Sequence, residues 1–598
     1  MKRAVGEEVL VEADVFTDGH DAVVAELLWK FTGEEHWQIV PMEFLGNDHW
    51  QAAFPVERLG RYEYTVRGWT DPFVTWQRDL KKRRDAGQDL SADFLIGARL
   101  ADIAELKDAA LPEEVRYRAA MEAMPPLPHA CAVVTYERTL QVVVDPERAR
   151  FSTWYELFPR SVRGDGKHAK FADVIERLAE IEAMGFDVLY FPPIHPIGVT
   201  ERKGKNNSLR AEPGDVGSPW AIGSKEGGHK AIHPALGSFD DFDALVREAA
   251  KRSISVALDI AFQCSPDHPY VREHPEWFRK RPDGTIQYAE NPPKKYQDIY
   301  PFDFETPQWR ELWRELKSVF EFWIGHGVKI FRVDNPHTKA FAFWEWCIGE
   351  LKASHPELIF LSEAFTRPRV MHKLAKLGFT QSYTYFTWRN SRYELTEYFT
   401  ELTKDPSREY FRANVWPNTP DILHEYLQQG GRPAFIVRVV LAATLAANYG
   451  LYGPAYELME HVPREPGSEE YLRSEKYEIK RWDTSRPDSL AALIGRLNDI
   501  RRQNAALQSD WSLQFHPTDN DQLLVYSKQE GENLVLVAVN LDPRYLQSGW
   551  VDFAWGEGKT YDLEDLLGGG RYTWAGRRNF VQLNPQTLPA HVFRVVRR

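Results

Sequence analysis

The feature that most constrains the fold is an alternation of apolar strands and amphipathic helices over more than 300 residues, starting near residue 150. Strands such as DVLYFPPI, SISVALDIA, VKIFRVDN and LIFLSEAF are apolar on both faces, and a helix with apolar residues at helical spacing leads into each next strand. Such strands are typical of a parallel sheet covered by helices. The length fits a (β/α)8 TIM barrel best, so the sequence predicts an α/β protein of this type.

The segments on either side of the barrel have a different pattern. Short alternating strands separated by Gly and Asp turns predict small β-sandwiches at both ends of the chain. A stretch with helical spacing interrupts the first of them, and a stretch without regular period interrupts the barrel as an elaborated loop. The expected organisation is an N-terminal β-sandwich at 1–88 completed by about 130–148, a helical insert at 89–129, the barrel at 149–510 with a loop subdomain at about 264–305, and a C-terminal β-sandwich at 511–598.

The composition excludes several classes of protein. The 598 residues carry a net charge of -13 that is spread along the chain, and no Lys/Arg block suits a nucleic acid. The three cysteines, Cys131, Cys264 and Cys347, are too few for a disulfide framework and are typical of a reducing compartment. No apolar run has the length of a membrane span, and the first residues lack the apolar core of a signal peptide. We therefore expect a cytoplasmic protein with no nucleic-acid or membrane partner.

Carboxylates stand at the ends of three predicted barrel strands, at Asp259, Asp334 and Glu363, and Asp421 in VWPNTPD is a fourth candidate. A single carboxylate at a strand end is as often a helix cap or an ion-pair partner as a functional residue. Several at one barrel mouth repel one another, which favours a functional site. Retaining glycosyl transfer uses such a set, with nucleophile and acid/base about 5–5.5 Å apart. Arg332 points the same way as Asp334 and would keep it ionised, or form a barrel salt bridge.

The strings around these residues resemble the conserved regions of glycoside hydrolase family 13, the α-amylase family. Within that family the chain is much more similar to one branch, the α-1,4-glucan:maltose-1-phosphate maltosyltransferases. The similar strings run from about residue 190 to 482, and the flanking segments match the branch's architecture. They are LYFPPIHPIGVTERKGKNNSL, LDIAFQCSPDHPY, NPPKKYQDIYPFDFE, FRVDNPHTK, LSEAFTRP, TYFTWRN, VWPNTPDIL, NYGLYGPAYEL and SEKYEIKRW.

The resemblance implies a role for each carboxylate. Asp334 would be the nucleophile, and Glu363 would protonate the departing phosphate where needed and then deprotonate the acceptor hydroxyl. Asp421 would stabilise the transition state and hold sugar hydroxyls. The residues expected to bind substrate are Lys203, Asn207, Asp259, Gln263, Asp298, Arg332, Asn335, Lys476 and Tyr477, with Asn291, Lys294 and Tyr296 near the phosphate.

The chain departs from ordinary amylases at two places. After the first conserved Asp it has Gln263-Cys264 where amylases usually have Asn-His, and its fourth region ends in NTPD where they have Asn-His-Asp. The maltosyltransferase branch shares both changes. Cys264 as a nucleophilic thiol is not favoured, because no base partner is evident and a carboxylate nucleophile is present. Lys294 and Lys295 are either solvated loop charges or the cations that a phosphate leaving group requires.

The leading hypothesis is a transferase that moves maltosyl units from α-maltose 1-phosphate to the non-reducing end of α-1,4-glucans in bacterial, glycogen-like glucan synthesis. The alternatives are an α-amylase-type hydrolase or a trehalose/maltose isomerase, which would use the same carboxylates, and a non-catalytic glycan-binding scaffold, which would lack them. We expect no cofactor and no metal, since no His/Cys cluster has ligand spacing in the sequence. The resemblance also implies a homodimer built through the N-terminal sandwich and the helical insert.

Overall fold

The computed structural model describes residues 1–125, 133–292, 294–556 and 558–597. Cys131 lies outside this part of the chain, as do the side chains of Asn291 and Lys294. The protein forms two compact units, Met1–Val144 and Asp145–Arg598, and each is described by itself. In the part of the chain that is described, no helix has the length and apolar character needed to cross a bilayer.

Two antiparallel sheets make up most of the first unit. One has the strand order β1-β9-β7-β3-β4, with β8 paired to β7, and the other has the order β2-β6-β5. Alternate residues of both sheets, including Val9, Leu27 and Phe54, are buried in one shared core, as in a β-sandwich. The strands are β1 Lys2–Ala4, β2 Glu7–Asp14, β3 Val23–Phe31, β4 Gln38–Pro41, β5 Glu43–Gly46, β6 His49–Val56, β7 Gly60–Thr70, β8 Val134–Thr135 and β9 Leu140–Asp145.

Four helices follow β7 and have a small core of their own. They begin at Pro72, earlier than the residue 89 at which the sequence pattern placed helical structure. The physical signal is at the start of the first helix, where the Asp71 carboxylate accepts hydrogen bonds from the N–H groups of Phe73 and Val74. The charged run that follows hides the apolar spacing of Phe73, Trp76 and Leu80. The helices are α1 Pro72–Asp85, α2 Ser91–Ala101, α3 Ala104–Lys107 and α4 Glu113–Glu122.

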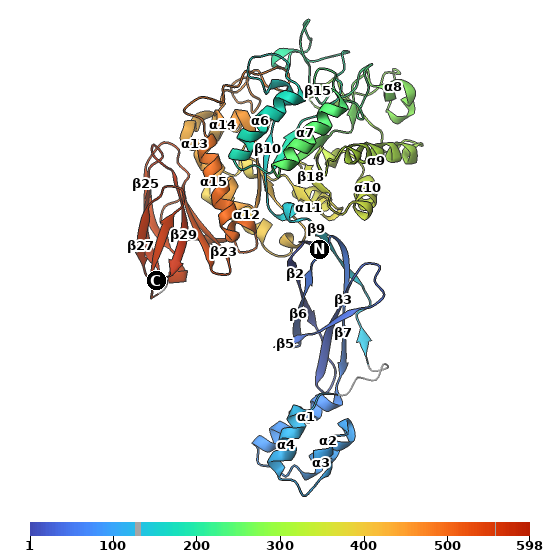
Figure 1. Ribbon diagram of the computed structural model, residues 1–598, viewed down its shortest axis with the longest axis vertical. Helices are drawn as coiled ribbons and strands as arrows, with labels where there is room; N and C mark the ends of the chain where they lie inside the picture. Colours follow the sequence, from blue (N-terminus) through green and yellow to red (C-terminus); the bar gives the residue numbers. More distant parts are fainter. Residues whose placement is uncertain (126–132, 293, 557, 598) are drawn as a thin grey trace. The chain divides into compact units, whose positions relative to one another are not determined.

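The second unit is built on an eight-stranded parallel barrel, which confirms the predicted TIM barrel (Figure 1). Its strands follow one another around the barrel in chain order. The two ends of the sheet meet at a parallel bridge between Ser382 and Ala413, where the Ser382 N–H donates to the Arg412 carbonyl at 3.0 Å. The strands are β10 Ser152–Glu156, β11 Val188–Phe191, β12 Ser255–Ile260, β17 Ile330–Asp334, β18 Ile359–Glu363, β19 Gln381–Ser382, β20 Asn414–Val415 and β21 Asn448–Tyr452.

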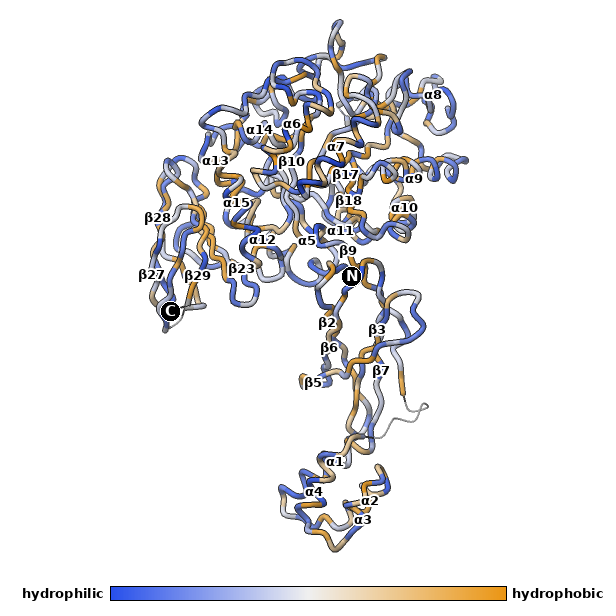
Figure 2. Tube along the Cα trace, in the orientation of Figure 1, coloured by the Kyte–Doolittle hydropathy of each residue, from blue (hydrophilic) through white to orange (hydrophobic). Residues whose placement is uncertain are grey.

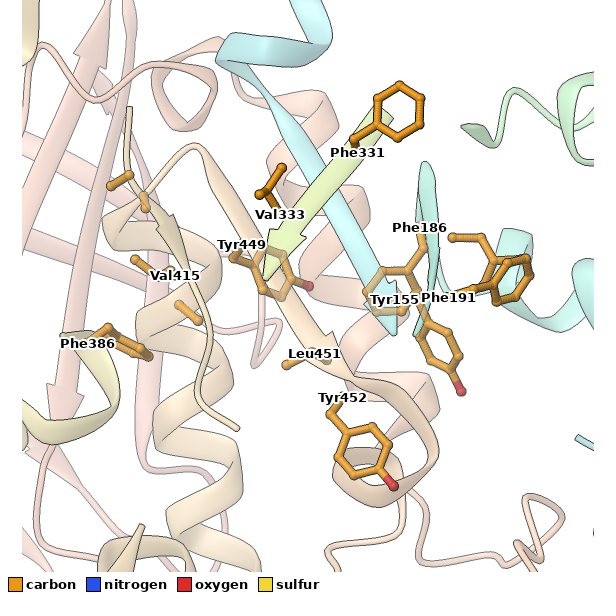
Figure 3. Close-up of a cluster of buried hydrophobic side chains, with 14 of the residues drawn as sticks. Tyr155, Phe186, Phe191, Phe331, Val333, Phe386, Val415, Tyr449, Leu451 and Tyr452 are labelled. Carbon is orange, nitrogen blue, oxygen red and sulfur yellow. The ribbon is translucent and has the colours of Figure 1, made fainter. Parts of the chain in front are cut away.

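Helices surround the barrel and bury its outer face. Figure 3 shows part of this layer, with Tyr155, Phe191, Phe331 and Leu451 projecting from the strands into a continuous apolar cluster. Every strand residue is buried except Ser255 and Glu363, which are half-buried at the ends of β12 and β18, as expected for parallel strands covered on both sides. The helices are α5 Glu147–Arg150, α6 Phe171–Ala183, α7 Phe239–Lys251, α9 Trp309–Gly325, α10 Phe341–Ser354, α11 Pro368–Lys376, α12 Arg392–Thr403, α13 Glu425–Leu445, α14 Gly453–Glu457 and α15 Ala491–Gln503.

Two further parts of this unit frame the barrel. The irregular stretch after β12 contains α8 Pro269–Glu273, which is mostly hydrophilic in Figure 2, and two small antiparallel pairs. After α15 the chain forms a six-stranded and a two-stranded antiparallel sheet with their own apolar core. These strands are β13 Gln263–Cys264, β14 Ala289–Asn291, β15 Lys294–Tyr296 and β16 Tyr300–Pro301, then β22 Gln514–His516, β23 Leu523–Glu530, β24 Asn533–Asn540, β25 Gln547–Asp552, β26 Thr560–Asp565, β27 Arg571–Ala575, β28 Arg578–Leu583 and β29 Ala590–Arg597.

Candidate active site

The carboxyl ends of three neighbouring strands bring the predicted carboxylates together. Asp259 lies in β12, Asp334 ends β17 and Glu363 ends β18. In the strand register Asp334 stands directly beside Glu363, and Asp259 stands beside Arg332. Adjacent strands are about 4.8 Å apart. The backbone therefore presents Asp334 and Glu363 at about the separation that a retaining pair requires.

The guanidinium of Arg332 lies at the centre of this group. It donates to both oxygens of Asp259 at 2.9 and 3.1 Å, to Asp334 at 2.9 Å, and lies 3.3 Å from an oxygen of Glu363. All four residues line the barrel mouth, and Arg332 is 6% exposed. One buried cation thus holds three carboxylates, which would otherwise repel one another.

The electrostatic environment gives the two central carboxylates different protonation behaviour. Burial alone would raise the pKa of Asp334, but the nearby Arg332 and Lys339 charges bring it below its ordinary value. Burial raises the pKa of Glu363 to about 7; Arg332 opposes this rise and the Asp334 charge adds to it. At neutral pH, Asp334 is therefore ionised while Glu363 readily exchanges a proton. This is the division between nucleophile and acid/base that glycosyl transfer uses.

Asp259 is held in place by neutral donors as well as by Arg332. The Tyr190 hydroxyl donates to its Oδ2 at 2.8 Å, and the indole N–H of Trp220 donates to the same oxygen at 3.0 Å. Burial raises the pKa of Asp259 to about 6, against the influence of Arg332. Asp259 therefore links Tyr190, Trp220 and Arg332 at the barrel mouth.

The turn after Asp334 has an unusual backbone that is supported by a lysine. Asn335 adopts the left-handed conformation with φ 43°, and its N–H donates to Glu363 Oε2 at 3.1 Å. The half-buried Lys339 donates from Nζ to the carbonyls of Asp334 and Asn335, each at 3.1 Å. Sequence reasoning missed Lys339. The signal that could have revealed it is a lysine five residues after a predicted nucleophile.

Asp421 lies on the loop after β20 and is paired with Lys476. The two charges are 2.7 Å apart, and the ammonium group also lies 4.8 Å from the centre of the Trp220 ring. Burial opposes the charge on Lys476, but the charges of Asp421, Tyr477 and Asp334 raise its pKa above the ordinary value. Asp421 itself is half exposed.

Three more of the residues expected to bind the substrate are Lys203, Gln263 and Asp298. Lys203 donates to Gln297 Oε1 at 3.2 Å, and Gln263 donates to the Trp220 carbonyl at 3.3 Å. Asp298 is buried, and its Oδ1 has no hydrogen-bond partner among the described residues. Burial raises the pKa of Asp298, while the Lys203 charge opposes this.

The other expected positions include two in the β14–β15 hairpin whose side chains lie outside the described residues. Tyr477, next to Lys476, is buried, and burial raises its pKa. Asn207 bonds Glu470 at 3.4 Å, which links two loops. Asn291 and Lys294 pair through their backbones in the β14–β15 hairpin, and their side chains lie outside the described residues. Tyr296, in the same hairpin, is half-buried.

A buried carboxyl that the sequence did not single out completes the site. Glu156 ends the first barrel strand, β10, and is 2% exposed. Burial raises its pKa well above the ordinary value; Arg332 opposes this rise, and the charges of Asp259 and Asp421 add to it. We therefore treat Glu156 as a neutral wall of the barrel mouth. Its apolar neighbours in TWYELFP concealed it.

Three potential metal ligands, His229 and the pair Cys264 and His268 that follows about 35 residues later, have ligand atoms within 4.8 Å of one another. The expectation of no His/Cys cluster missed them, because their spacing is not that of a local motif. The Tyr270 N–H donates to Nδ1 of His268 at 3.0 Å, His268 Nε2 faces His229 Nδ1 at 3.1 Å, and His229 Nε2 faces the Ala261 carbonyl at 2.9 Å. Burial lowers the pKa of His229 to about 4 and of His268 to about 2. The hydrogen bonds use all four ring nitrogens, so the cluster is explained as a neutral network that supports the loop after β12.

The barrel and its carboxylates define the class as an α-amylase-type barrel. The aspartate ends the fourth strand, the glutamate ends the fifth, and Asp421 follows the seventh. A maltogenic α-amylase from Thermotoga neapolitana has a similar structure, with a TM-score of 0.58 and 19% identity over 75% of this chain and 99% of that chain. An α-amylase from Lactobacillus plantarum has a TM-score of 0.55 and 19% identity over 73% of this chain and 100% of that chain. At these identities the likeness concerns the fold.

Sequence similarity narrows the class to one family. A family model described as α-1,4-glucan:maltose-1-phosphate maltosyltransferase, domain N/S, matches residues 1–162, and one described as GLGE, C-terminal, matches 515–595. Relatives named α-1,4-glucan:maltose-1-phosphate maltosyltransferase include that of Chlorobaculum tepidum, 53% identical over 100% of this chain and 94% of the relative, and that of Methylacidiphilum infernorum, 50% identical over 100% and 93%. The chain belongs to the α-1,4-glucan:maltose-1-phosphate maltosyltransferase family.

Proposed function

We propose that the protein transfers maltosyl units from α-maltose 1-phosphate to the non-reducing end of α-1,4-glucans and releases inorganic phosphate. The observation that carries this proposal is the set of Asp334, Glu363 and Arg332 at the barrel mouth, in a chain 53% identical over its whole length to a named maltosyltransferase. The set supplies a nucleophile, a proton carrier and a cation. These are the groups that a two-step retaining transfer requires.

In the first step, Asp334 attacks the anomeric carbon of the maltosyl group. The bond between that carbon and the phosphate oxygen breaks, and its electron pair leaves with the phosphate. Glu363, whose pKa is raised to about 7, supplies a proton to the departing oxygen where one is needed. The product is a β-maltosyl ester on Asp334, formed with inversion at the carbon.

In the second step, the 4-hydroxyl of the glucan's terminal sugar attacks the same carbon. Glu363, now a carboxylate, accepts the hydroxyl proton, and the bond to Asp334 breaks. A second inversion restores the α configuration, so the new linkage is α-1,4. Asp421, half exposed and paired with Lys476 at 2.7 Å, holds sugar hydroxyls in this proposal as charge develops at the carbon.

Phosphate as the leaving group is supported by the cations of the site. Lys476 lies within the electrostatic influence of Asp334, and Lys203 lies beside Asp298 on the rim. Asn335 follows the nucleophile in a left-handed turn, with φ 43°, and supplies an amide donor from the position next to Asp334. Ammonium and amide donors of this kind stabilise phosphate oxygens through charge-assisted hydrogen bonds.

The setting of the activity is part of the proposal. We infer a cytoplasmic, glycogen-like glucan synthesis and a homodimer formed through the N-terminal sandwich and helical segment. The first unit exposes large apolar side chains, including Phe16, Phe44 and Leu95, which supports an interface there. Sedimentation of the protein should give twice the mass of one chain. A monomer at micromolar concentration would contradict the proposed dimer and leave the proposed activity unaffected.

The activity is tested by measuring inorganic phosphate with α-maltose 1-phosphate and maltooligosaccharides of graded length. We expect phosphate release that depends on the acceptor and products longer by one maltosyl unit. Asp334→Ala, which removes the nucleophile, should abolish both. Cleavage of maltotetraose by water, without phosphate release from the donor, would favour the hydrolase alternative and refute the proposal.

A further inference from the structure

Arg160 connects two loops of the barrel mouth, and the reaction steps above do not use it. It lies in the short helical turn Pro159–Ser161 directly after β10 and is 5% exposed. Its Nη1 donates to the Gly217 carbonyl at 3.0 Å, and its Nη2 donates to the carbonyls of Glu475 and Lys476 at 2.8 and 3.0 Å. One planar guanidinium therefore fixes the separation between two stretches of chain that are far apart in the sequence.

Each stretch delivers a side chain to the site. The first carries Trp220, whose indole N–H donates to Asp259 at 3.0 Å. The second carries Lys476, whose ammonium group lies 4.8 Å from the centre of the Trp220 ring and 2.7 Å from Asp421. Since Arg160 bonds the backbone carbonyl of Lys476 itself, a shift at this point moves the base of the side chain relative to both Trp220 and Asp421.

A second contact anchors the same loop from the other side. The Glu475 carboxylate is 1% exposed and accepts from the Tyr452 hydroxyl at 2.5 Å and from the Trp482 indole at 3.1 Å. Tyr452 ends β21, the barrel strand next to β10. The loop is thus held by side chains that follow two adjacent strands. Of these two anchors, Arg160 also reaches the Trp220 segment, through the Gly217 carbonyl.

We propose that Arg160 is a positioning residue for Lys476: it holds the 474–477 loop against the segment of Trp220 so that the lysine stays between Trp220 and Asp421. The inference deepens the proposed function and rests on it for the substrate. A lysine at position 160 keeps the charge but lacks the fork of donors, so it cannot serve the three carbonyls in the same geometry. The role is specific to a guanidinium.

A double-mutant cycle tests this role. Arg160→Met should lower kcat/KM for α-maltose 1-phosphate by about 10²-fold, the loss that a displacement near 1 Å can cause. In a Lys476→Met background the same change should cost no more than about twofold, because the lysine it positions is gone. An equal loss in both backgrounds would show that Arg160 does not act through Lys476 and would overturn the proposal.

Two further variants separate positioning from general stability. Arg438 is 2% exposed and, among the described residues, also donates to backbone carbonyls, those of Arg389 and Phe386. Arg438→Met should therefore lower the melting temperature about as much as Arg160→Met, and its effect on kcat/KM should be the same with and without Lys476. Arg160→Lys should behave like Arg160→Met in the cycle, and it replaces that variant if the methionine protein does not fold. Full activity of Arg160→Lys would contradict the proposal.

The cycle can also be measured without turnover. Maltose affinity is measured by calorimetry for the wild type, Arg160→Met, Lys476→Met and the double variant. Arg160→Met should lower this affinity less when Lys476 is already replaced. The binding measurement separates failure of the proposed function from failure of the role of Arg160. A wild type that releases no phosphate refutes the proposed function, whereas additive losses of maltose affinity refute the role of Arg160.

Discussion

Replacing Arg332 by methionine tests the electrostatic design of the site. Among the described residues, the guanidinium is the one group with hydrogen-bond or ion-pair contacts to Asp259, Asp334 and Glu363 together, at 2.9 to 3.3 Å. Two unit charges about 4 Å apart interact by about 4 kcal/mol at an effective dielectric constant near 20. An adjacent opposite charge accordingly lowers a carboxyl pKa by about 1–3. Without Arg332, the pKa of Asp334 should rise by that amount.

The assay is the pH dependence of kcat/KM with α-maltose 1-phosphate. In the wild type, Asp334 stays ionised down to pH values below the ordinary pKa of an aspartate. Activity falls on the alkaline side, because Glu363, with its pKa of about 7, loses its proton there. In Arg332→Met the acid limb should move up by about 1–3 pH units. Below the new pKa, activity should fall tenfold per unit of pH.

A compensating substitution makes the test specific. Asp259→Asn removes one of the carboxylates that Arg332 neutralises, so adding it to Arg332→Met should move the acid limb partly back. Asp259→Asn alone is the matched control for the loss of that charge. An acid limb that stays in place in folded Arg332→Met protein would refute the claim that this cation keeps the nucleophile ionised.

Three further predictions concern neighbouring features. The buried Asp145 is paired with Lys352 and Arg412, which outweigh burial and lower its pKa from 3.8 to about 2. This stabilises the fold by about 2 kcal/mol above pH 4, and the contribution is lost as pH falls through 2. Asp145→Asn should therefore lower the melting temperature at pH 7 but not near pH 2; equal losses at both would contradict the pairing. Lys339→Met removes the donor to the carbonyls of Asp334 and Asn335 and should reduce kcat about tenfold; an unchanged kcat would contradict a supporting role. Dialysis against a chelator should leave phosphate release unchanged, and a loss restored by calcium would contradict the expected independence of metal.

The barrel was predictable where its strands are long and apolar. The strands β10, β11, β12, β17 and β18 appear in the sequence as apolar runs, and three of them carry the carboxylates. The strands β19 and β20 have two residues each and leave no periodic signal. They include Gln381 and Asn414, which are buried but polar, and the Asn414 amide donates to Gln381 Oε1 at 2.9 Å. Buried polar side chains bonded to each other close the barrel there, and hydropathy alone does not reveal them.

The site was predictable as a set of residues but not as a set of contacts. Strand-end placement points to Asp334 and Glu363, but the bond from Arg332 to three carboxylates depends on the register of three strands. The positions of Lys339 and Arg160 depend on which carbonyls the folded loops present to them. Such side chain to backbone contacts have no sequence spacing of their own.

The central claim is that Asp334 carries the maltosyl group between donor and acceptor. Glu363→Gln keeps the nucleophile and removes the base that deprotonates the acceptor, so the ester should accumulate. Intact mass measurement of this variant with α-maltose 1-phosphate should show one added maltosyl group and an equivalent of released phosphate, and peptide mapping should place the group on Asp334. Phosphate release with no added mass, or a maltosyl group on another residue, would contradict the account.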